Sequence, residues 1–170
     1  IPYVISGIMA VIIAIVARSH RRRQGATAVC CLMVAAAVWS LGNALEICSV
    51  GLEAKTLWAS VEYLGIATVP VAWFATALGL TGKSEWLNLR NVVLLMAVPT
   101  ATQVIVWTNR YHGLMRYDVR IDASGPFAVI AKTYGPWFWI TVVYSYTLLA
   151  VGTARVMKAM IELPGPYRAR

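Results

Sequence analysis

The chain has 170 residues, of which 59% are hydrophobic and 13% are charged, and its net charge is +8. Soluble domains carry about 25% charged residues, so this composition excludes an ordinary soluble domain. The basic residues fall between apolar blocks and do not gather on one surface, which argues against nucleic-acid binding and is typical of membrane topology signals. We therefore expect the lipid bilayer as the partner of this chain and no nucleic acid.

Five apolar blocks follow one another along the chain, and each is long enough to cross about 30 Å of hydrocarbon. They predict transmembrane helices at residues 2–17, 27–47, 57–80, 91–107 and 137–160. The first block also fits the core of a signal peptide, but it lacks a cleavage site and a preceding positive stretch, which favours a spanning helix. The sequence thus predicts an all-α membrane fold, a polytopic bundle of about five transmembrane helices forming one domain over residues 1–170.

The segment from residue 109 to residue 136 is too polar to span a membrane and too long for a simple turn. Between Met115 and Asp122, apolar and charged residues alternate with a period of two, which is the pattern of a half-buried strand. Residues 123–126 read as a turn, and residues 127–131 are a second apolar stretch. We expect a small extracytoplasmic β-hairpin that caps the bundle, with an irregular loop as the alternative.

The distribution of Lys and Arg predicts how the bundle is oriented, because cytoplasmic loops are enriched in these residues. One side holds ten of them: Arg18, Arg21, Arg22, Arg23, Lys83, Arg90, Arg155, Lys158, Arg168 and Arg170. The other side holds five: Lys55, Arg110, Arg116, Arg120 and Lys132. We therefore expect a multi-pass protein of the cytoplasmic (inner) membrane with its amino end outside and its carboxyl end in the cytoplasm.

Two carboxylates, Glu46 and Glu62, lie within predicted spans, where an ionisable residue is costly and usually functional. Both lie toward the outer side, and Asn43 is one helical turn from Glu46. We expect a ligand pocket that opens outward. Its candidate residues are Trp39, Asn43, Glu46, Trp58, Glu62 and Tyr63, joined from the outer segment by His112, Tyr134 and Trp137.

A structural interpretation of the same residues stays open. Trp and Tyr are enriched at both membrane interfaces as anchors. A carboxylate near a helix end also pairs readily with a loop arginine, here Arg110 or Arg116.

The sequence predicts neither a metal site nor a cofactor nor a catalytic residue. Cys30, Cys31 and Cys48 do not have the spacing of metal ligands, and neither histidine has partners at such spacing. No HExxH motif, no Ser/His/Asp set and no glycine-rich phosphate loop is present.

Several stretches share the order and spacing of one known family. Residues 39–82 read WSLGNALEICSVGLEAKTLWASVEYLGIATVPVAWFATALGLTG, and residues 134–150 read YGPWFWITVVYSYTLLA. The characteristic positions are Trp39, Glu46, Lys55, Trp58, Tyr63, Gly65, Pro70 and Trp73, followed by Pro99 and by His112 within residues 108–114. In these positions the chain resembles the amino-terminal seven-helix region of bacterial and archaeal histidine kinases.

The resemblance implies a membrane-embedded sensory module that detects an unknown extracytoplasmic or intramembrane stimulus. In that family two further helices and a cytoplasmic output module normally follow. The chain has no phosphoacceptor histidine region and no ATP-binding motif, so we expect no enzyme activity of its own. A homodimer is implied by analogy with sensor kinases.

Two other functions remain open from the sequence, namely a structural or accessory subunit of a larger membrane complex and a transporter component. The inner halves of the second to fifth blocks hold almost no charge, which argues against a continuous ion pathway.

Overall fold

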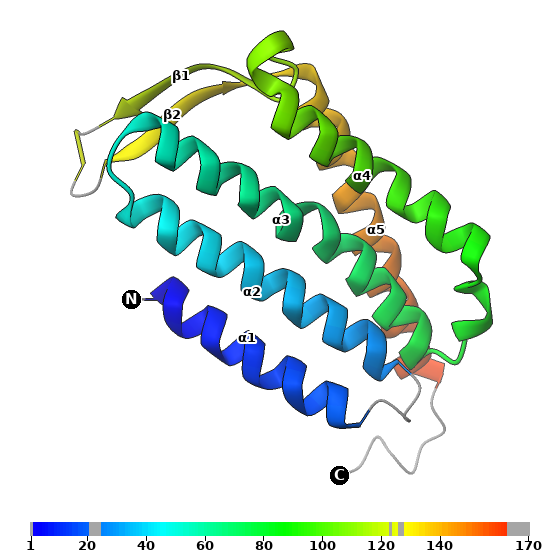
Figure 1. The fold of residues 1–170 in the computed structure, drawn as a ribbon. Helices are drawn as coiled ribbons and strands as arrows, with labels where there is room; N and C mark the ends of the chain where they lie inside the picture. Colours follow the sequence, from blue (N-terminus) through cyan, green and yellow to red (C-terminus); the bar gives the residue numbers. More distant parts are fainter. Residues whose placement is uncertain (1, 21–24, 123, 126–127, 163–170) are drawn as a thin grey trace.

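The computed structural model describes residues 2–20, 25–122, 124–125 and 128–162 (Figure 1). The sequence-based expectations for the arginines at 21–23, for the turn and apolar residues at 123 and 126–127, and for the basic residues after 162 lie outside this range.

Five helices in the described part of the chain are long and apolar enough to cross a membrane: α1 (Pro2–Ser19), α2 (Ala26–Cys48), α3 (Leu52–Leu80), α4 (Leu89–His112) and α5 (Pro136–Glu162). A short 3-10 turn, η1 (Ser84–Trp86), precedes α4. The prediction of a polytopic bundle is therefore confirmed. Each helix extends beyond the apolar block that predicted it, because polar residues continue a helix at the membrane surface.

The largest differences from the predicted bounds lie at the ends of α3 and α4. Helix α3 begins at Leu52, so Lys55 belongs to a helix and is not part of a loop. Helix α4 begins after Asn88, whose side chain accepts a hydrogen bond from the Asn91 N–H at 3.0 Å. It continues to His112 and ends at Gly113, whose φ of 60° is the left-handed conformation typical of a helix C-terminus.

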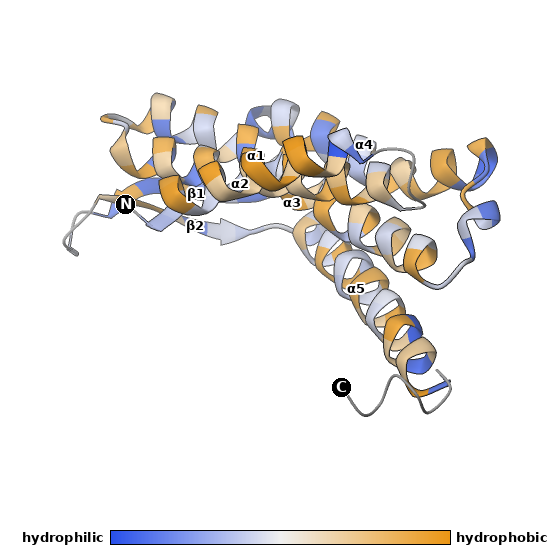
Figure 2. Cartoon of the chain, turned by 90° about the horizontal axis from the view of Figure 1, so that it is seen from below, coloured by the Kyte–Doolittle hydropathy of each residue, from blue (hydrophilic) through white to orange (hydrophobic). Residues whose placement is uncertain are grey.

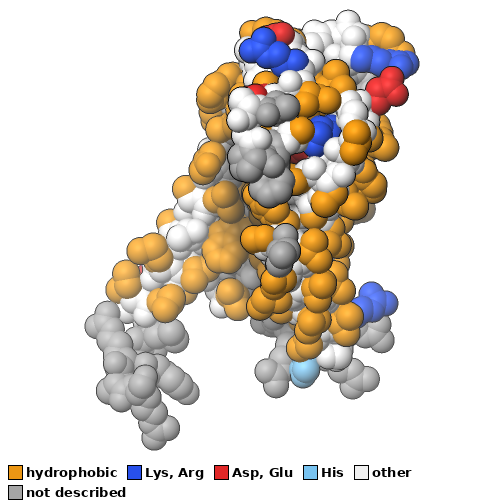
Figure 3. Space-filling view, turned by 90° about the vertical axis from the view of Figure 1, so that its left-hand side faces the viewer, with side chains coloured by type: hydrophobic (Ala, Val, Ile, Leu, Met, Phe, Trp, Pro, Cys, Tyr) orange, Lys and Arg blue, Asp and Glu red, His pale blue; other side chains and the backbone are white. Residues whose placement is uncertain are grey.

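Helix α3 is the centre of the bundle. It packs against α2, α4 and α5, while α1 packs on the far side of α2 (Figure 1). Helices α1 to α4 lie side by side as a layer, and α5 crosses beneath α3 and extends away from this layer (Figure 2). Half of the buried residues in the described ranges belong to α3, whereas α1 exposes nearly all of its large apolar side chains. Apolar side chains cover the length of the surface in Figure 3, as a bilayer requires.

Two antiparallel strands, β1 (Arg116–Asp122) and β2 (Val129–Tyr134), confirm the predicted hairpin. Arg116 pairs with Tyr134, and a register irregularity lies between Tyr117 and Arg120. Asn109 of α4 holds the start of the hairpin, because its Oδ1 accepts from the N–H of Met115 at 2.9 Å and its Nδ2 donates to the Arg116 carbonyl at 2.7 Å.

The start of the hairpin places an apolar residue and a charged residue against the helices. Met115 and Arg116 are both buried, whereas Tyr117 is 51% exposed and Ile121 is 41% exposed. The alternation therefore does not divide β1 into a buried and an exposed side, and Arg116 is buried because its guanidinium finds hydrogen-bond acceptors on α3.

Candidate functional site

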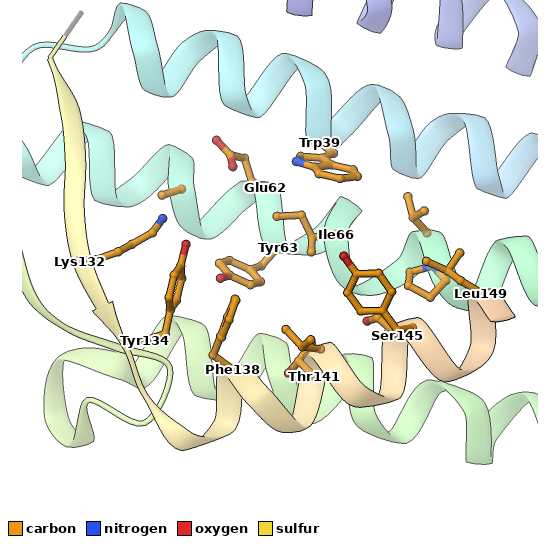
Figure 4. A pocket seen from close by; sticks show the side chains of 15 residues that line it. Trp39, Glu62, Tyr63, Ile66, Lys132, Tyr134, Phe138, Thr141, Ser145 and Leu149 are labelled. Carbon is orange, nitrogen blue, oxygen red and sulfur yellow. The ribbon is translucent and has the colours of Figure 1, made fainter. Parts of the chain in front are cut away.

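A cavity of about 370 Å³ lies between α2, α3, β2 and α5 (Figure 4). Its walls are mostly apolar, and several aromatic rings contribute to them. The lining residues are Trp39, Ala59, Glu62, Tyr63, Ile66, Val69, Pro70, Lys132, Tyr134, Phe138, Thr141, Val142, Ser145, Tyr146 and Leu149.

The cavity is elongated along the helices. Its lining runs from Ala59 to Pro70 on α3 and from Phe138 to Leu149 on α5. Each of these stretches contains twelve residues and therefore spans about 16 Å at the helical rise of about 1.5 Å per residue. On both helices the lining residues recur at intervals of three and four, so each helix presents a single side to the cavity.

The polar end of the cavity lies beneath the hairpin. Lys132 of β2, Glu62 of α3 and Tyr134 of β2 meet there (Figure 4). The Nζ of Lys132 is 5.9 Å from the centre of the Tyr134 ring. Burial lowers the pKa of Lys132, and the nearby positive charge of Arg116 lowers it further. The cavity thus combines one amino group and one carboxyl group at one end with an apolar interior.

Glu62 lies where α3 packs closely against α2. A Cβ placed on Gly42 would lie 2.8 Å from the Cγ of Glu62, so only glycine leaves room for this side chain. Asn43 and Glu46 of α2 lie beside it. The Oε1 of Glu62 and the Oδ1 of Asn43 are buried and have no hydrogen-bond partner in the described part of the chain. Unsatisfied buried acceptors are costly, so this end of the cavity suits a ligand or water that donates hydrogen bonds.

Four of the nine predicted site residues line the cavity: Trp39, Glu62, Tyr63 and Tyr134. Asn43 and Glu46 do not line it, but they surround Glu62. The structure therefore brings these six side chains to one region of the bundle.

The remaining three predicted residues lie elsewhere. His112 terminates α4: its Nε2 lies 3.0 Å from the Thr108 hydroxyl, and its Nδ1 accepts from the Leu114 N–H at 3.1 Å. Trp137 packs against a buried cluster that contains Tyr63, and its Nε1 donates to the Thr102 hydroxyl at 3.1 Å. Trp58 is half-buried on α3 and does not line the cavity.

The alternative pairing of the glutamates with loop arginines is wrong for the described residues. No ion pair shorter than 4.0 Å joins Glu46 or Glu62 to Arg110 or Arg116. The Arg110 guanidinium instead lies 4.6 Å from the centre of the Tyr111 ring. The Arg116 guanidinium donates to α3, as described below.

Sequence reasoning missed Lys132 and the cavity-lining side of α5. Lys132 was counted only as a topology signal, although it is two residues from Tyr134 and therefore on the same side of its strand. Phe138, Thr141, Ser145 and Tyr146 recur at helical spacing, but their pattern alone does not distinguish a cavity wall from a lipid-facing surface.

A second buried amine, Lys55, has a structural role. Its Nζ donates to the carbonyl oxygens of Glu46 at 2.8 Å and of Ile47 at 3.4 Å, at the C-terminus of α2. Within the ranges that the structure describes, no three His, Cys, Asp or Glu side chains lie close enough together to hold a metal ion.

The apolar helices and the capping hairpin define a multi-pass membrane protein with a part-polar cavity at the hairpin end of the bundle. Residues 2–170 match the model of one family, described as the N-terminal 7TM region of histidine kinase. The chain belongs to this family. No curated protein and no solved structure gives a significant match.

Proposed function

We propose that this chain is the sensory input region of a histidine kinase and that the cavity beneath the hairpin is where its stimulus acts. The observation that carries the proposal is the buried carboxyl group of Glu62, whose Oε1 has no partner in the described part of the chain, together with Lys132 at the end of an otherwise apolar cavity. A polar group of this kind within a membrane bundle is costly and is usually retained for function. Family membership supports a signalling role for the whole region.

The arrangement offers a route from the cavity to the far end of the bundle. Helix α5 lines the cavity from Phe138 to Leu149 and continues to Glu162. A stimulus shifts a population only if it binds two arrangements of the bundle with different affinity. A ligand that fits one spacing of α5 from α3 better than another would therefore bias the position of the far end of α5, and through it the parts of the kinase that this end contacts.

We place the hairpin and the amino end outside the cytoplasmic membrane and the carboxyl end of α5 inside. The support is the excess of Lys and Arg on the side opposite the hairpin. In this orientation the cavity lies toward the outer surface, with the hairpin as its cover.

Replacing Glu62 by glutamine tests the proposed site. Glu62→Gln keeps the size of the side chain and removes the ionisable carboxyl group, so we expect a folded protein whose autophosphorylation in native membrane vesicles changes at least about fivefold. Glu85→Gln, which removes an exposed carboxylate at the opposite end of the bundle, is the matched control and is expected to leave phosphorylation unchanged.

The readout is radiolabelled phosphate incorporated by the full-length protein at equal expression, with circular dichroism as the check on folding. Normal phosphorylation in folded Glu62→Gln and Glu46→Gln variants would show that the carboxylates are not part of the input site.

A further inference from the structure

Arg116 is buried without a counter-ion. Its residue is only 3% exposed, although a guanidinium keeps its charge in proteins. Its Nη2 donates to the Ser60 hydroxyl at 2.7 Å and to the Thr56 carbonyl at 3.2 Å, while its Nη1 is buried with no partner in the described ranges. No carboxylate among the described residues lies within 4.0 Å of it, and Glu46 and Glu62 act on its charge only from a greater distance. A buried charge usually has an oppositely charged partner in direct contact, so an anion that contacts the guanidinium would be favourable here.

Arg116 lines a second cavity, of about 510 Å³, which shares no lining residue with the first. This cavity lies between the first turns of α3, the last turns of α4 and β1. Two of its lining residues, Arg116 and Arg110, are positively charged, and its other polar residues, Asn109, Thr56 and Ser60, are neutral. Glu53 is its one acidic residue, and that side chain belongs to an exposed position at the start of α3. The charge of the cavity therefore favours an anionic occupant.

The remaining walls of the second cavity are apolar and open to the surroundings of the bundle. Leu57 is 48% exposed and Trp107 is 50% exposed, on α3 and α4 respectively. An exposed tryptophan near the end of a spanning helix is typical of the membrane interface, the depth at which lipid headgroups lie. An occupant that satisfies both the buried guanidinium and these walls carries an anionic group joined to an apolar portion.

We propose that the second cavity binds the phosphate of an anionic membrane lipid and that Arg116 is the residue that recognises it. Nη1 of the guanidinium has no partner in the described ranges and can donate to phosphate oxygens while Nη2 keeps its bonds to Ser60 and Thr56. An amine has a single nitrogen and cannot reproduce this arrangement. The Ser60 hydroxyl accepts from Nη2 and so holds the guanidinium in place. Free phosphate would form the same hydrogen bonds to Arg116, but it has no apolar portion to contact the apolar walls of the cavity.

Native mass spectrometry of the purified full chain tests the proposal. The protein is incubated with equal amounts of phosphatidylglycerol and phosphatidylcholine that have the same acyl chains. We expect it to retain about tenfold more phosphatidylglycerol. Arg116→Lys keeps a positive charge but has a single nitrogen, which cannot bind both Ser60 and the phosphate as the guanidinium does, and we expect it to lower phosphatidylglycerol retention at least about fivefold. Arg120→Gln removes a positive charge from an exposed position on the same strand and is expected to retain as much lipid as the wild type.

Ser60→Ala keeps the arginine and tests its positioning if Arg116→Lys fails to fold. We expect it to lower phosphatidylglycerol retention about threefold. Inorganic phosphate at millimolar concentration distinguishes the sources of the anion, and we expect it not to displace the lipid. Equal retention of the two lipids by the wild type would overturn the proposal. So would wild-type retention of phosphatidylglycerol by a folded Arg116→Lys variant or by the Ser60→Ala variant. Displacement of the lipid by inorganic phosphate would also overturn it.

Discussion

Replacing Gly65 by leucine is expected to separate α2 from α3 and to prevent the bundle from folding. A Cβ on Gly65 would overlap the carbonyl oxygen of Ala35 and would lie 2.7 Å from the backbone nitrogen of Trp39. These are backbone atoms of α2 and cannot move aside as a flexible side chain can. Overpacking usually costs 1–3 kcal/mol, so we expect the larger leucine side chain to cost about 3 kcal/mol or more.

The free energy of unfolding in mixed SDS micelles measures this effect. Ala97→Leu is the matched control, because it adds the same side chain at an exposed position of α4 and is expected to change stability little. A Gly65→Leu variant as stable as the control would mean that α2 and α3 do not approach as closely as the structure shows.

Replacing Lys55 by methionine is expected to destabilise the hairpin end of α2. Methionine fills a similar volume, but it donates no hydrogen bond to the carbonyl oxygens of Glu46 and Ile47. The substitution also removes a positive charge from a helix C-terminus, where a cation is favourable. Lost hydrogen bonds to a charged donor contribute about 1.5–3 kcal/mol each, so we expect a loss of about 2–4 kcal/mol.

Hydrogen exchange of residues 45–52, together with the unfolding free energy, reports this change. Lys83→Met removes an exposed lysine at the opposite end of the bundle and serves as the control. If the two variants lose equal stability, the bonds from Lys55 do not stabilise α2.

The fold could be predicted from the sequence because a membrane constrains composition so strongly. Five apolar blocks gave five helices, and the alternation after Met115 gave a hairpin. The ends of α4 could not be read from hydropathy, because residues 108–112 are polar yet remain helical up to Gly113. The position of a helix terminus depends on capping residues and on the conformation of glycine, and neither can be predicted from the hydropathy of the apolar block.

The candidate site could be predicted only in part, for a related reason. Glu62 could be predicted as a site residue because an ionisable group within a membrane is costly and is usually functional. The residues near it on the same helix could be predicted from helical spacing. Spacing does not define which neighbouring helix each side faces, so Trp58 was included and the lining side of α5 was missed. The burial of Arg116 could not be predicted, because alternation does not show that its guanidinium finds hydrogen-bond acceptors on α3.

The central claim is that the cavity beneath the hairpin controls the output of this region, and adjacent valines on α5 allow a direct test. Val142 lines the cavity, whereas Val143 is 67% exposed on the same helix. Each would be changed to cysteine after Cys30, Cys31 and Cys48 are replaced by alanine, and then modified with the membrane-permeant reagent benzyl methanethiosulfonate.

Autophosphorylation of the full-length protein in membrane vesicles, before and after this modification, is the decisive measurement. A benzyl group on residue 142 fills part of the cavity, so we expect phosphorylation to change at least about fivefold and to recover when a reducing agent removes the group. The same group on residue 143 points into lipid and is expected to change nothing. Complete modification of both cysteines with unchanged phosphorylation, or with equal changes, would contradict the account.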